Sequence, residues 1–86
     1  MSPMEFHASV MGYCYATMAS VSSYGRTAKH NADVGSVHQD SYHLQWLAAD
    51  VVYDEPIVKA RKDQIARRFG LEVVVEGDHD HLEPSP

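Results

Sequence analysis

The chain carries one cysteine, Cys14, among its 86 residues, and this limits how the fold can be stabilised. A chain of this length forms one domain with a small core, and domains of this size commonly need a disulfide, a metal ion or a partner chain. A single cysteine excludes a disulfide within the chain and suits a reducing compartment. We therefore expect a metal ion or a homo-oligomer to supplement the core, with Cys14 as a small core residue.

Charge and hydropathy argue against two classes of partner. The net charge is −5, and the basic residues fall mainly on one predicted helix, between apolar positions. We therefore expect no nucleic-acid partner. No apolar run approaches the length of a membrane span, and the N-terminus lacks the pattern of a signal peptide. These features predict no membrane partner and a cytoplasmic location, or a phage-encoded protein that reaches the cell wall by a separate route.

Helical and alternating patterns predict an α+β fold, with residues 1–86 as a single domain. The expected architecture is a small antiparallel sheet with flanking helices. Strands are predicted at residues 17–23, 48–53 and 71–75, with a hairpin strand at 77–83. Helical segments are predicted at residues 1–16 and 54–70, and residues 84–86 form a tail.

Residues 54–70 give the strongest helical pattern. Asp54 is the expected N-cap, Pro56 is compatible with the first turn, and Gly70 is expected to close the helix. An apolar stripe that starts at Val58 is expected to face the core. By contrast, residues 26–43 are polar, and we expect a long surface loop of the kind that is usually functional.

Six histidines are many for a chain of this length, and several lie near acidic residues. A catalytic zinc site normally takes three ligands from His, Asp, Glu or Cys and leaves one position open. His43 and Asp50 bracket an apolar run and could supply two ligands. His79 and His81 are two residues apart, so on a strand they project to the same face and could supply a third.

The general base depends on the register of the final motif. Asp78 stands three residues before His81, and Glu76 stands three before His79. A carboxylate at either position could act as general base on a metal-bound water, whose pKa zinc lowers to about 7. Spacing alone leaves both registers open.

One segment, "SYHLQWLAAD" (residues 41–50), resembles the zinc motif Ser-x-His-x-x-Gly-x-Ala-x-Asp of the D-Ala-D-Ala carboxypeptidases and dipeptidases and of the phage L-alanyl-D-glutamate peptidases. The positions in register are Ser41, His43, Ala48 and Asp50. Trp46 takes the place of the glycine. "SSYGRTAKHNADVG" upstream and "DHDHLE" near the C-terminus resemble two further segments of this family, in the same order. The resemblance covers roughly residues 20–84 and implies a fold like that of Hedgehog and the D-Ala-D-Ala peptidases.

The resemblance implies a zinc ion (Zn2+) as cofactor, with the ligands His43, Asp50 and His81. Asp78 would be the general base, because Leu82–Glu83 continue the family pattern after His81. The alternative pairs Glu76 as base with His79 as ligand. In the first register His79 has a catalytic role, as the non-ligand histidine of the His-x-His pair in the wider lysostaphin- and Hedgehog-like fold.

The resemblance also implies two substrate-binding residues, Arg26 and Ser41. Arg26 would stabilise the carbonyl oxygen as it gains charge, or bind a substrate carboxylate. Ser41 would bind the substrate or support the loop. Trp46 is expected as a core or lid aromatic, and if the glycine it replaces required a positive φ, tryptophan would distort the neighbouring loop.

The resemblance therefore implies a zinc-dependent peptidase that hydrolyses peptidoglycan stem peptides, at either a D-Ala-D-Ala or an L-Ala-D-Glu bond. An alternative is a zinc-stapled binding or structural module without turnover, for example in a phage particle. A third possibility is a small oligomeric scaffold that holds no metal. The sequence leaves the bond, the host and the oligomeric state open.

Overall fold

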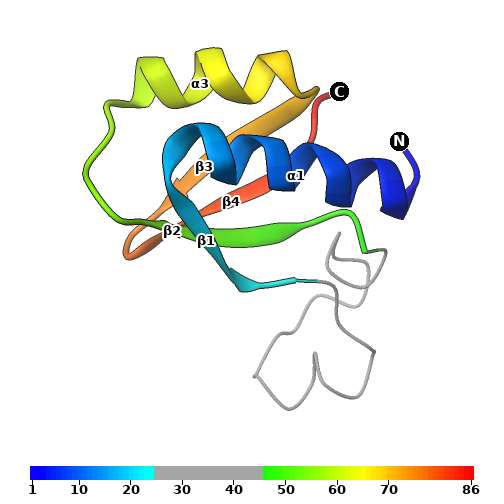
Figure 1. The fold of residues 1–86 in the computed structure, drawn as a ribbon, viewed down its shortest axis with the longest axis horizontal. Helices are drawn as coiled ribbons and strands as arrows, with labels where there is room; N and C mark the ends of the chain where they lie inside the picture. The colour runs from blue at the N-terminus through cyan, green and yellow to red at the C-terminus, as the bar shows by residue number, and fades with distance from the viewer. Residues whose placement is uncertain (25–45) are drawn as a thin grey trace.

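The computed structural model describes residues 1–24 and 46–86, which form two helices and a four-stranded antiparallel sheet (Figure 1). The elements in chain order are α1 (Pro3–Thr17), β1 (Ala19–Ser23), β2 (Ala49–Tyr53), α3 (Lys59–Arg68), β3 (Leu71–Glu76) and β4 (His79–Pro84). The strands lie in the order β1-β2-β4-β3, so the C-terminal strand is inserted between two earlier ones. The predicted α+β class, with an antiparallel sheet and flanking helices, is confirmed.

Helix α1 begins at a complete capping box. The Ser2 hydroxyl accepts a hydrogen bond from the Glu5 backbone N–H at 3.2 Å, and the Glu5 carboxylate accepts one from the Ser2 N–H at 2.9 Å. This reciprocal pair satisfies two N–H groups that a helix start leaves free, and Pro3 follows at the first helical position, where its missing N–H costs nothing. The helix ends at Thr17, and the left-handed conformation of its C-cap Met18 turns the chain directly into β1.

Helix α3 starts later than its sequence pattern predicts. Its N-cap is Val58, and Asp54 instead donates its backbone N–H to the carbonyl of Met18 at 3.0 Å, beyond the ends of β1 and β2. Pro56 contributes to this shift because proline disfavours helical geometry in the residue before it, Glu55. The predicted N-cap at Asp54 is therefore wrong, and Val58 is 73% exposed rather than part of the core.

The end of α3 agrees with the sequence. Gly70 follows the C-cap Phe69 with a φ of +70°, the left-handed position that glycine fills without steric cost. Phe69 packs closely against α1, and a Cβ atom added at Gly12 would collide with its ring. Glycine at position 12 therefore permits the close approach of the two helices.

The core lies between the helices and one face of the sheet, here called the inner face. Helices α1 and α3 contact each other and both lie over this face (Figure 1). Because side chains alternate along a strand, Ala49, Val51, Leu71, Val73 and Leu82 are buried on the inner face. The helices contribute Phe6, Val10, Tyr13, Cys14, Ile65 and Ala66. The predicted core position of Cys14 is confirmed.

The inner face also holds four polar side chains that pair with one another. Asp80 of β4 is 3% exposed, and its carboxylate lies 2.8 Å from Nζ of Lys62 on α3. The hydroxyl groups of Tyr13 and Tyr53 lie 2.6 Å apart, and Lys62 Nζ lies 4.6 Å from the centre of the Tyr53 ring. Burial raises the pKa of Tyr13 to about 12. The charges of Asp80 and Lys62 therefore compensate each other inside the core, which a buried charge requires.

Neither helix in the described ranges combines the length and the apolar character needed to cross a lipid bilayer.

Candidate metal centre

The opposite face of the sheet, here called the outer face, gathers ionisable side chains from three strands. In the register of β2 and β4, Asp50 lies opposite His81, and in the β3–β4 hairpin Glu76 lies opposite His79. Side chains opposed in this way across antiparallel strands have Cβ atoms about 4.5–5.5 Å apart. The strand pairing alone therefore brings two histidines and two carboxylates together.

His81 lies at the centre of this group. Its Nδ1 is 3.2 Å from Oδ1 of Asp50 and 3.7 Å from Oε1 of Glu76. Its Nε2 is 3.1 Å from Oε2 of Glu83, the next residue along β4 on the same face. The His81 and Asp50 side chains are 16% and 17% exposed. The hydrogen bond with Asp50 raises the pKa of His81, and the hydrogen bond with Glu83 adds to this effect.

Asp78 lies in a different environment from the other acidic residues. It follows Gly77, whose φ of +73° allows the tight turn between β3 and β4, and its side chain is 97% exposed. Its carboxylate lies 2.8 Å from Nδ1 of His79, and this hydrogen bond lowers the pKa of Asp78 and raises that of His79. Asp78 therefore supports His79 from the solvent side of the hairpin.

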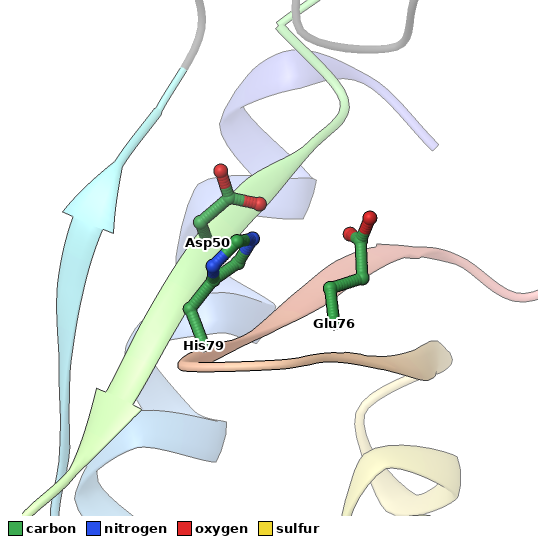
Figure 2. Close-up of side chains that lie close together, drawn as sticks. All are labelled: Asp50, Glu76 and His79. Carbon is green, nitrogen blue, oxygen red and sulfur yellow. The ribbon is translucent and has the colours of Figure 1, made fainter.

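Three residues of the outer face lie close enough together to share a cation. Asp50, Glu76 and His79 each place one potential ligand atom within 4.8 Å of the others. Figure 2 shows the His79 ring on the hairpin extending toward the Asp50 carboxylate on β2, with the Glu76 side chain to the right and pointing in the same direction. Carboxylate oxygen and imidazole nitrogen are donors that zinc accepts, so the chemistry of this group fits the expected ion.

The structure thus brings together Asp50, His79 and His81, three of the residues that the sequence predicted for the site. Arg26, Ser41 and His43 lie outside the described residues, so their predicted roles stay predictions.

Glu76, the base of the alternative register, lies beside His81 even though it is five positions earlier in the chain. The carboxylate side chain of Glu83 was matched only as part of a motif, without a role. The two-residue alternation that places His79 and His81 on one face of the strand also places Glu83 there. This alternation could have identified Glu83 as a residue of the site.

Trp46 occupies a backbone conformation that favours glycine. Its φ is +58°, and it stands where the motif that this segment resembles has glycine. The ring is 46% exposed and therefore not in the core, and its centre lies 6.2 Å from that of Tyr24. It lines an apolar hollow of about 410 Å³ together with Tyr24, Pro3, Met4 and His7.

Neither a protein-family model, nor a curated protein, nor a solved structure matches this chain.

Proposed function

We propose that the protein is a zinc-dependent peptidase related to the D-Ala-D-Ala carboxypeptidases and L-alanyl-D-glutamate peptidases, acting on peptidoglycan stem peptides. The observation that carries this proposal is the direct pairing of Asp50 and His81 on the outer face. Oδ1 of Asp50 lies 3.2 Å from Nδ1 of His81, although the two residues belong to strands that are distant in the sequence. Two motif blocks that resemble the same family supply these two residues, and a four-stranded antiparallel sheet with helices on one face is compatible with that family's fold.

The metal ligands in this proposal are Asp50, His81 and, from outside the described residues, His43. When bound, zinc would polarise the peptide carbonyl and lower the pKa of a water molecule to about 7. Asp50 and His81 come from adjacent strands of one sheet, which holds their relative positions more firmly than loop residues would.

Glu76 is the better candidate for the general base. Its carboxylate lies 3.7 Å from His81 Nδ1, whereas Asp78 is almost fully exposed and bound to His79. A base must reach the proton that it accepts, and Glu76, unlike Asp78, lies next to the proposed ligand His81. The proposed site therefore combines the ligand of the first predicted register, His81, with the base of the alternative register, Glu76.

His79 would stabilise negative charge on the substrate. Its hydrogen bond to Asp78 raises its pKa, which favours the protonated ring, and its ring lies beside Asp50 at the edge of the proposed site. A protonated imidazole placed there can donate a hydrogen bond to the carbonyl oxygen as it gains charge.

The proposal is tested with purified cell-wall sacculi. The protein should release new amino groups from the stem peptides, and a chelator or the substitution His81→Ala should abolish this release. Binding to sacculi with no released amino groups would instead support a zinc-containing module without turnover.

Two matched substitutions test the choice of base. Glu76→Gln should lower the rate of hydrolysis by about 10²- to 10⁴-fold while zinc remains bound, because a general base contributes about this much. Asp78→Asn makes the same chemical change at the exposed position and should leave most of the activity. The reverse pattern would return the base to Asp78.

One observation favours a second candidate, a scaffold without metal. Both ring nitrogens of His81 have a carboxylate within 3.2 Å, an arrangement that can hold a protonated imidazole with no cation present. Elemental analysis separates the two candidates, since a scaffold of this kind would contain no zinc after purification with zinc in the buffer.

A further inference from the structure

We propose that Glu83 is a positioning residue that orients the His81 ring so that Nδ1, and not Nε2, faces the metal. This inference rests on the proposed zinc site but assigns a role to a residue that is not one of its ligands.

The first step is the position of Glu83 relative to the two sides of the ring. Its Oε2 lies 3.1 Å from Nε2, while Asp50 and Glu76 both face Nδ1, at 3.2 and 3.7 Å. A cation shared by His81 and Asp50 must therefore approach Nδ1. The opposite nitrogen, Nε2, then donates its hydrogen to Glu83.

The second step is the protonation of a metal-binding histidine. A ligand imidazole is neutral and has one N–H, so a lone pair on Nδ1 requires the hydrogen on Nε2. The carboxylate of Glu83 accepts that hydrogen and fixes both the tautomer and the ring orientation. Carboxylate partners of this kind also raise the basicity of the ligand nitrogen.

The third step is the rigidity of the arrangement. Glu83 and His81 lie on the same face of β4, and the central position of β4 between β2 and β3 fixes its backbone on both sides. The side chains of His81 and Glu83 are 16% and 23% exposed. A partly buried hydrogen bond between two residues of one central strand holds the ring more strictly than a loop residue would.

The matched control is Glu72. It lies opposite Glu83 in the β3–β4 register and on the same face, but its side chain is exposed. Glu72→Ala removes the same charge from the same face as Glu83→Ala, and so reports the effect of charge alone.

The first test measures zinc affinity of the full chain by competition with a chelating dye. Glu83→Ala should bind zinc about 10- to 100-fold more weakly, the usual effect of removing such a partner. Glu83→Gln should recover most of the affinity, because its amide oxygen still accepts from Nε2–H. Glu72→Ala should bind like the unchanged protein. Equal loss in Glu83→Gln and Glu83→Ala, or equal loss in Glu72→Ala, would overturn the positioning role.

The second test needs no substitution and so does not depend on how a variant folds. The protein is labelled with ¹⁵N-histidine and loaded with ¹¹³Cd in place of zinc, and the coupling between metal and ring nitrogen is measured by NMR. Coupling to Nδ1 of His81 is expected, and coupling to Nε2 would overturn the proposal.

Failure of this inference can be told apart from failure of the proposed function. Hydrolysis and zinc binding that survive unchanged in Glu83→Ala would reject the role of Glu83 alone. An unchanged protein that binds neither zinc nor cadmium would reject the metal site, and with it this role.

Discussion

The two faces of strand β4 handle charge in opposite ways. On the inner face Asp80 is buried and paired with a lysine, Lys62, at 2.8 Å. On the outer face, within the described ranges, the ion pairs join carboxylates to histidines, with His81 in contact with Asp50 and Glu83. A lysine neutralises a carboxylate permanently, whereas a histidine can give up its proton and offer a lone pair. The comparison teaches that alternate residues of one strand can carry charge for separate purposes, stability on the inner face and, in the proposed site, metal binding on the outer face.

The largest expected effect on stability comes from the inner face. Asp80→Asn leaves the Lys62 ammonium without its partner and should lower the free energy of unfolding by about 3 kcal/mol, because breaking a buried ion pair costs about 3–5 kcal/mol. Denaturant unfolding monitored by circular dichroism measures this change. Zinc binding by the folded fraction should be unaffected.

The control for Asp80→Asn is Asp63→Asn. Asp63 pairs with Lys59 at 2.7 Å on the exposed side of α3, and such i,i+4 pairs contribute about 0.3–0.5 kcal/mol. If the two substitutions lowered stability equally, the inner pair would not have the special role assigned to it. Loss of zinc in Asp80→Asn, with folding intact, would break the separation of the two faces.

A smaller effect is expected from pH in the metal-free protein. The pKa of His81 is raised, first by Asp50 and then by Glu83, so protonation of the ring stabilises the fold. This contribution is fully present below the ordinary histidine pKa of about 6.5 and is lost as pH rises through the raised value. The slopes of the stability curves of the unchanged protein and His81→Gln should therefore differ between about pH 6.5 and the raised value, and should agree below and above this range.

Protonation of His81 should have the opposite effect on metal binding. Zinc and a proton compete for His81, so zinc affinity should increase as pH rises through the range in which the metal-free fold loses stability. His7→Gln, a change of an exposed histidine on α1, serves as the control and should preserve both profiles. Stability that is independent of pH in this range would contradict the contacts assigned to His81.

Removing one hydroxyl from the inner face should have a modest effect. Tyr53→Phe leaves the Tyr13 hydroxyl without its partner at 2.6 Å, and the loss of one such hydrogen bond costs about 1 kcal/mol. Thermal unfolding gives the measurement. A variant more stable than the unchanged protein would show that the two hydroxyl groups are not compensating each other in the core.

The smallest expected effect on stability comes from substitutions of Trp46, which lies shortly before β2. Trp46 has a φ of +58°, so Trp46→Gly should be more stable than Trp46→Ala by about 1 kcal/mol, because only glycine adopts this conformation without a steric penalty. Both variants lose the ring beside Tyr24, so their difference isolates the backbone. Equal unfolding free energies would show that position 46 does not require the left-handed conformation.

The sequence predicted much of the outer face because strand alternation is a short-range property. The pair His79 and His81 follows from two-residue periodicity, and a strand that contains Asp50 follows from its β-branched neighbours. That Asp50 would lie opposite His81 depends on strand order, since β4 is inserted next to β2. Spacing in the sequence contains no such information, and the family resemblance was needed to suggest it.

The placement of the acidic residues could not be predicted from the sequence. Gly77 and Asp78 form a tight turn, which sets Glu76 opposite His79 and directs Asp78 to solvent. A hairpin of different length would exchange these two carboxylates, so the choice of base depends on the turn and not on the distance in residues. The start of α3 was misplaced for a similar reason, because the contact of Asp54 with Met18 is long-range.

The most direct test of the central claim is the zinc content of three proteins purified in parallel and dialysed against trace zinc. The unchanged protein and His7→Ala should both contain stoichiometric zinc, whereas His81→Ala should contain none while keeping its secondary structure. Stoichiometric zinc in His81→Ala, or no zinc in the unchanged protein, would contradict the claim that the outer face of this sheet is a metal site.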